Sequence, residues 1–197
     1  WMIPHTISHI FRSFKIIYNH LKSDLIENVK KRITDATDAT KTSVLVVEPG
    51  ATINAAGTAA APITFTANLP TSELECTGAN CQTVTDSLTG ATVSHGSRGN
   101  WGGIIILGSA TIKGGTANIE GLNPPVAYGG NNDADNSGVL QYVRVWHGGM
   151  SIGADNEING ITFGGVGSGT TVDHCEVALN VDDGFEFFGG TVDVSFL

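Results

Sequence analysis

Residues 161–190 read ITFGGVGSGTTVDHCEVALNVDDGFEFFGG and contain the clearest internal repeat of the chain. A Gly-Gly pair at 164–165 follows Ile161-Thr-Phe, and a second pair at 189–190 follows Glu186-Phe-Phe, a step of 25 residues. A step of this length fits one coil of a solenoid built from stacked strands. The repeat therefore predicts that this part of the chain winds as a β-helix.

The same kind of sequence extends back to Ser43. Short runs rich in β-branched and aromatic residues alternate with Gly, Asn, Asp and Ser, which predicts an all-β domain. A sandwich, a barrel and a solenoid all fit such runs. Hairpin signals are scarce, because no Asn-Gly or Asp-Gly pair links two equal alternating strands. Together with the repeat, this favours a right-handed parallel β-helix.

Charge and glycine content divide the chain into two parts. Residues 1–41 carry seven Lys or Arg and four Asp or Glu, a net charge of +3, whereas the remainder carries three and fifteen, a net charge of −12. All 26 glycines fall at or after Gly50. We expect an N-terminal segment over 1–42 and a β-helix over 43–197, with loop insertions near 70–100 and 115–138. An acidic domain without a basic stripe excludes nucleic acid as a partner and suits cations or neutral glycans.

The N-terminal segment has a different periodicity. Apolar residues recur at steps of three and four from Ile10 to Ile33, with basic residues between them, which predicts an amphipathic α-helix over residues 8–34. Such a helix can lie on an anionic membrane, or it can cover an apolar surface of its own protein or of a second copy; we favour the packing role. No apolar run is long enough to span a membrane.

Three cysteines indicate in which cellular compartment the protein is found. Cys76 and Cys81 bracket a short polar loop, and Cys175 stands alone in a strand-like run. Two free surface thiols would fit this spacing, but we favour a local disulfide, which implies export. The chain opens with Trp1-Met2 and shows no secretory signal, so we expect a trimmed, fused or fragmentary chain.

Four stretches resemble a family of exported bacterial parallel β-helix proteins, largely uncharacterised and often described as lipoproteins or surface proteins of Bacteroidetes and marine bacteria. They are RGNWGGIIILG at 98–108, the loop YGGNNDADNSG at 128–138, NEINGITFGGVGSGT at 156–170, and the segment at 172–191. The resemblance implies a β-helix fold and an extracellular or cell-surface location, and it implies no particular reaction. Members of that family continue through further coils, so we expect this chain to be a truncated solenoid.

Carboxylates gather near the second repeat. Asp182, Asp183 and Glu186 lie close together in sequence, and in a β-helix Asp173 or Glu176 of the preceding coil could join them. Such a group can bind a hard cation, with Ca²⁺ the expected cofactor and the first three plus Asp173 as ligands. Alternatively, Asp183 and Glu186 can act as an acid–base pair on a glycan. In the simplest interpretation the two aspartates bond turn backbone and Glu186 is solvated.

Aromatic residues suggest a second candidate site. Trp101, Tyr142 and Trp146 are the aromatic residues most able to stack on sugar rings, although packing within the coils is the alternative and is favoured for Trp101. Trp146, next to His147, is the better surface candidate, so we expect Tyr142, Trp146 and His147 to bind a ligand. No nucleophile elbow surrounds Ser151 or Ser168, which disfavours a serine hydrolase.

Our leading hypothesis is therefore a non-catalytic exported surface or matrix protein that presents an acidic face to glycans or cations. A polysaccharide lyase, or a glycoside or ester hydrolase, that uses Asp183 and Glu186 is the first alternative. A self-assembling structural module is the second, in which homo-oligomers form through the N-terminal helix or through open coil ends.

Overall fold

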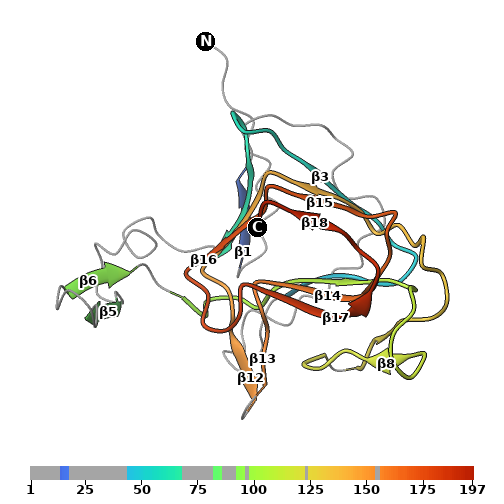
Figure 1. The fold of residues 1–197 in the computed structure, drawn as a ribbon. Helices are drawn as coiled ribbons and strands as arrows, with labels where there is room; N and C mark the ends of the chain where they lie inside the picture. Colours follow the sequence, from blue (N-terminus) through green and yellow to red (C-terminus); the bar gives the residue numbers. More distant parts are fainter. Residues whose placement is uncertain are drawn as a thin grey trace.

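The computed structural model describes residues 44–67, 98–122, 124–153 and 156–197, together with the strands at 14–17, 82–85 and 92–95. Every regular element in these residues is a β-strand, and three sheets of four strands enclose the core (Figure 1). The first sheet contains β2 (Val44–Val47), β7 (Gly103–Leu107), β14 (Ile161–Val166) and β17 (Phe185–Gly190). The second contains β3 (Ile53–Ala56), β10 (Gly138–Gln141), β15 (Thr171–Asp173) and β18 (Val194–Ser195). The third contains β1 (Phe14–Ile17), β4 (Ile63–Ala67), β11 (Val143–Trp146) and β16 (Glu176–Ala178).

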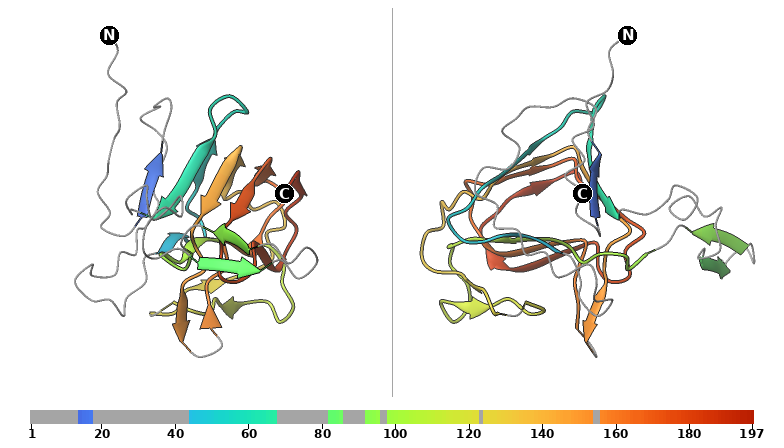
Figure 2. Two further views of the ribbon diagram at one scale, coloured as in Figure 1. Left: turned by 90° about the vertical axis from the view of Figure 1, so that its left-hand side faces the viewer. Right: turned by 180° about the vertical axis from the view of Figure 1, so that it is seen from behind.

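Each coil of the chain visits the three sheets in turn. The first coil runs through β2, β3 and β4, the next two through β7, β10, β11 and β14, β15, β16, and the last through β17 and β18. Strands of successive coils pair in parallel throughout and lie side by side in Figure 2. This confirms the predicted parallel β-helix. The step between the last two coils in the first sheet is 24 residues, because Phe163 pairs with Phe187, so the two Gly-Gly pairs are offset by one position.

Inward side chains stack from coil to coil. Ile104 lies between Leu45 and Ile161 in the first sheet, and in the third sheet Val145 lies between Phe65 and Val177. Apart from Val177, which is partly buried, these residues are at most 3% exposed. Burial of one such side chain contributes about 1.5–3 kcal/mol. The stacks explain why the apolar runs of the sequence are short and regularly repeated.

A second apolar layer covers the outer face of the first sheet. Residues 108–122 and 124–130 leave the second coil and fold back beneath this sheet, where they form the hairpin of β8 (Ala117–Asn118) and β9 (Ala127–Tyr128) (Figure 1). Ile119 and Tyr128 from this segment pack with Ile105 and Leu107 of β7. The strands β2 and β7 are therefore buried on both faces, which explains why their sequences are continuous apolar runs.

Two further hairpins project from the coils. They pair β5 (Gln82–Thr85) with β6 (Thr92–His95), and β12 (Ser151–Gly153) with β13 (Asn156–Glu157). In the described part of the chain no helix is long and apolar enough to cross a membrane.

The N-terminal α-helix is not found where the structure describes that segment. Phe14–Ile17 form the extended strand β1, which pairs antiparallel with β4 (Figure 2). For these residues the helical prediction is wrong, because the free edge of β4 offers unpaired backbone groups and Phe and Ile suit an extended backbone. The other residues of the predicted helix lie outside the described residues, as do Cys76 and Cys81.

Candidate ligand-binding site

The outer face of the third sheet carries a polar cluster built by strand alternation. In β11, Val143 and Val145 point into the core, so Arg144 and Trp146 point outward. The parallel register places Glu176 of β16 opposite Arg144. Neighbouring coils thus bring together residues that are about thirty positions apart in sequence.

Glu176 holds this cluster together. Its Oε2 lies 3.5 Å from Arg144 Nε, and its Oε1 accepts a hydrogen bond of 2.7 Å from Trp146 Nε1. The Arg144 guanidinium lies 5.6 Å from the centroid of the Trp146 ring, within the range of a cation–π contact. The side chains of Arg144 and Glu176 are 41% and 49% exposed. The cluster is therefore ordered by its own contacts and still open to solvent.

A column of three rings stands beside the cluster, at the corner between the second and third sheets. Tyr142, His174 and Phe196 occupy equivalent corners of successive coils, each with a left-handed backbone (φ 49°, 50° and 53°). The His174 ring stacks on Tyr142 at 4.5 Å and on Phe196 at 4.4 Å. A residue with positive φ turns the chain sharply between the sheets, and the ring contacts help to offset its conformational cost.

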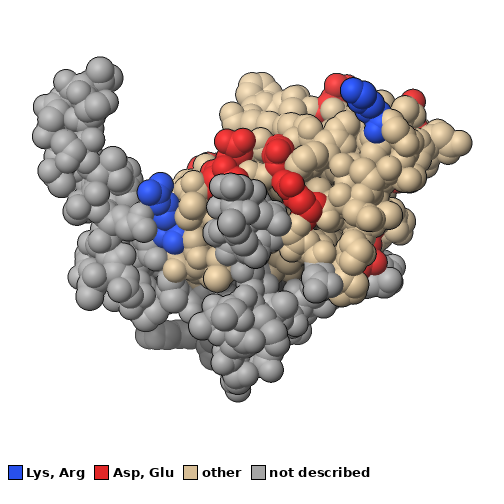
Figure 3. All heavy atoms as spheres, turned by 90° about the horizontal axis from the view of Figure 1, so that it is seen from below, with Lys and Arg blue, Asp and Glu red and all other residues tan. Residues whose placement is uncertain are grey.

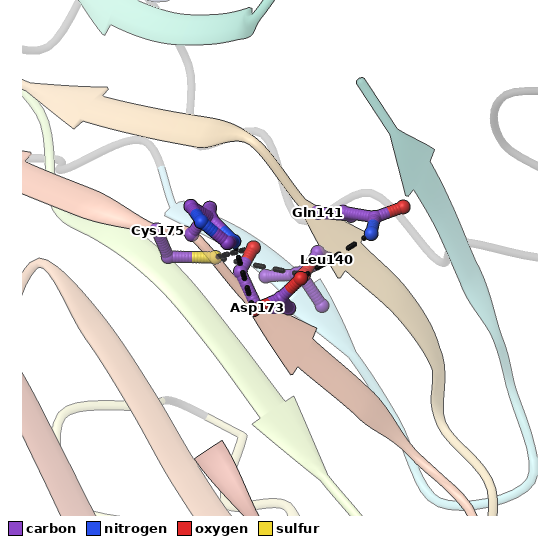
Figure 4. Close-up of polar contacts among 5 residues, drawn as sticks. Leu140, Gln141, Asp173 and Cys175 are labelled. Atoms are coloured by element: carbon purple, nitrogen blue, oxygen red, sulfur yellow. Dashed lines mark hydrogen bonds and ion pairs between the residues drawn. The ribbon is translucent and has the colours of Figure 1, made fainter. Parts of the chain in front are cut away.

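Asp173 orients the middle ring of this column. Its Oδ1 lies 2.9 Å from His174 Nδ1, and its Oδ2 accepts a hydrogen bond of 3.3 Å from Gln141 Nε2 (Figure 4). The hydrogen bond from His174 is the largest of the effects that lower the pKa of Asp173. Cys175, by contrast, points its thiol toward the Leu140 carbonyl, and burial raises the pKa of this thiol.

These residues surround a shallow pocket of about 250 Å³. Its polar rim consists of Tyr142, Arg144, His174 and Glu176, and its remaining lining consists of Ala59, Pro62, Cys175 and Phe196. Two of the three residues predicted to bind a ligand, Tyr142 and Trp146, therefore lie at or beside the pocket. His147 does not join them, because it is only 3% exposed and follows the strand in a buried corner.

The predicted carboxylate group lies elsewhere, on the outer face of the first sheet. Glu186 of β17 sits opposite Thr162 of β14, and its Oε2 accepts a hydrogen bond from the Asn159 amide. Burial raises the pKa of Glu186, and the negative charges of Glu120, Asp183 and Asp182 raise it further. Figure 3 shows acidic side chains gathered near the middle of this side of the molecule.

The structure does not bring the predicted metal ligands together. Asp173 belongs to the second sheet and bonds His174, whereas Glu186 belongs to the first. The exposed Asp182 and Asp183 use their backbone carbonyls to accept hydrogen bonds from the Asn180 amide. Within the described ranges, no group of three or more His, Cys, Asp or Glu side chains is placed to hold a metal ion.

Sequence reasoning did not assign Arg144, His174 and Glu176 to one site. The signal that could have located them is the alternation Val-Arg-Val-Trp at 143–146, combined with a coil step of 32 residues between Val145 and Val177. Glu120 was also missed as a neighbour of Glu186, because it comes from the hairpin segment rather than from a coil.

Comparison with known proteins adds one finding. A family model described as pectate-lyase like beta helix domain matches residues 77–197, which contain the strands from β5 to β18. No curated protein and no solved structure matches the chain. The match covers more than half of the 197 residues and coincides with three of the four coils described above. The chain therefore belongs to the family of pectate-lyase like β-helix domains.

Proposed function

We propose that this chain is an exported cell-surface or matrix protein that binds glycans on the outer face of its third sheet, without catalysis. The observation that carries the proposal is the cluster of Arg144, Trp146 and Glu176. An indole ring that is partly exposed and fixed by a hydrogen bond is suited to pack against a sugar ring. A guanidinium and a carboxylate beside it supply donors and acceptors for hydroxyl groups.

The pocket next to the cluster supports the same function. A volume of about 250 Å³ accommodates one sugar unit rather than a long chain segment. Its open position on a flat sheet would let a polysaccharide run across the coils while one unit enters the pocket. Affinity at such a site comes from a few ring and hydrogen-bond contacts, so we expect weak binding per unit.

A glycan array tests this proposal. The parent protein should bind a subset of printed glycans, and Trp146→Ala should lose that signal because the stacking surface is removed. Lys113→Ala is the matched control for Arg144→Ala, since both remove one positive charge but Lys113 lies on an exposed loop away from the pocket. Equal binding by the parent, Trp146→Ala and Arg144→Ala would contradict the proposal.

Hydrolysis or elimination at Glu186 is the second candidate function. The raised pKa of Glu186 favours it, because a general acid must keep its proton at the working pH. Asp183, the predicted partner, is near enough to contribute to that shift. A screen of polysaccharide and ester substrates with the parent, Glu186→Gln and Asp183→Asn tests this candidate. Turnover that persists in both variants would exclude these two carboxylates.

Self-association completes the proposal. Self-association is favoured by apolar side chains that are exposed in the last coil, namely Val181 at 47% and Phe187 at 44%.

A further inference from the structure

The contacts of His174 define which of its ring nitrogens is available to a ligand. Asp173 is acceptor-only when ionised, so Nδ1 of the neutral imidazole carries the hydrogen in the bond to Oδ1. The other nitrogen, Nε2, is then a hydrogen-bond acceptor. The Gln141 amide donates a hydrogen bond to the other carboxylate oxygen of Asp173, Oδ2. This second contact keeps the carboxylate oriented toward His174 Nδ1.

The ring itself is also held. Its two faces are covered by Tyr142 and Phe196, with interplanar angles of 24° on both sides, and its backbone sits at φ 50°. Among the described residues, His174 Nε2 has no hydrogen-bond partner, although His174 lines the pocket together with Arg144 and Glu176. His174, whose remaining ring nitrogen is an acceptor, therefore lines a pocket that also contains the cationic donor Arg144.

We propose that this pocket selects an uncharged sugar unit, with one hydroxyl that donates to His174 Nε2 and accepts from Arg144. The inference rests on the proposed glycan-binding function and adds to it the class of sugar. A hydroxyl group both donates and accepts, so it satisfies the two protein groups at once. A carboxylate can only accept, and it would leave Nε2 without a donor.

The charges around the pocket favour the same class. Arg144 is paired with Glu176, and Asp173 is paired with a neutral imidazole, so the site carries a net charge of −1 and repels a carboxylate.

Matched pairs of sugars test the inference. Methyl galactoside and methyl glucoside differ from the corresponding uronic acids only at C6, and their affinities can be measured by ligand-observed NMR titration at pH 8. At this pH the neutral member of at least one pair should bind about tenfold more tightly than its acid.

The fold itself offers a matched variant. Phe196 occupies the same corner in the next coil with almost the same φ, so His174→Phe should keep the ring column while it removes Nε2. We expect His174→Phe to lose about three- to tenfold in affinity for the neutral sugar and to lose the preference for it over the acid. Asp173→Asn removes the carboxylate that fixes the tautomer of His174 but keeps the imidazole ring. It should reduce the preference for the neutral sugar at pH 8, and it replaces His174→Phe in the test if that variant does not fold.

Three outcomes would overturn the inference. The first is unchanged affinity for the neutral sugar and unchanged selectivity in His174→Phe and Asp173→Asn, and the second is tighter binding of the acids at pH 8. In both cases, if Trp146→Ala still abolishes sugar binding, the proposed function stands and only the selection by His174 fails. The third is failure of all four sugars to bind the parent while the array is also negative, which contradicts the proposed function and the inference together.

Discussion

The rings of Phe163 and Phe187 stack at a centroid distance of 4.9 Å and an angle of 10°, directly opposite each other in β14 and β17. Phe163 is fully buried between coils, whereas Phe187 is 44% exposed. We therefore expect Phe163→Ala to lower the free energy of unfolding by about 3–5 kcal/mol, and Phe187→Ala to lower it by less than half as much. Urea unfolding of both variants checks this. Equal losses would mean that the last coil is covered in solution.

Glycine at position 138 should be indispensable. Its backbone has φ 109°, and a Cβ there would meet the Ile53 carbonyl oxygen at 1.9 Å. Gly114 has a comparable φ of 89°, but a Cβ at that position would meet nothing within 4 Å. Gly114→Ala should cost about 1–2 kcal/mol from the left-handed conformation alone, whereas Gly138→Ala should cost clearly more because the coils must separate. Calorimetry of the pair measures the difference, and similar melting temperatures would argue against the coil register between β3 and β10.

The Glu186 carboxyl should make stability depend on pH. Its pKa is raised in the folded state, so the folded protein holds the proton more tightly than the unfolded chain does. Its contribution to stability is then fully present at low pH and is lost as pH rises above the ordinary value of 4.5 and through the folded pKa. Glu186→Gln keeps the acceptor for Asn159 and removes the charge. The variant should be more stable than the parent at pH 8, with a difference that shrinks toward pH 4; a constant difference across this range would be inconsistent with the shift.

The cysteines should respond differently to alkylation. Cys175 is buried and its thiol pKa is raised, so it should react slowly in native protein. If Cys76 and Cys81 form the predicted disulfide, denatured protein without reductant should take up one alkyl group, and denatured protein with reductant should take up three. Mass spectrometry distinguishes these states. Uptake of three groups without reductant would remove the disulfide.

The sequence was most informative about the coils. Apolar runs such as Ile104-Ile-Ile-Leu and Ile161-Thr-Phe repeat with Gly between them, and both form parallel strands of one sheet. The exact register was not available from the Gly-Gly pairs, because Gly164 pairs with Phe188 rather than with the next pair. Glycines mark the bends of a coil, and bends shift by a residue more easily than stacked side chains do.

The site was harder to derive. Tyr142 and Trp146 could be identified as candidates because aromatic residues outside a regular apolar pattern stand out. Their partners His174 and Glu176 are placed by the pairing of β11 with β16, and a register is a long-range property that local patterns do not contain. For the same reason Asp173 was grouped with Glu186, although the two lie on different sheets.

Glycan binding at the outer face of the third sheet is tested most directly by the indole signals of tryptophan in an NMR titration. Trp146 Nε1 bonds the exposed Glu176, whereas Trp101 is fully buried and bonds the Trp146 carbonyl. The chain has three tryptophans, so the variants Trp146→Phe and Trp1→Phe together assign the three indole signals. On addition of a glycan selected by the array, we predict a large saturable shift of the Trp146 indole signal and a much smaller change at Trp101. Binding of that glycan with no change at Trp146 would place the site elsewhere and contradict the account.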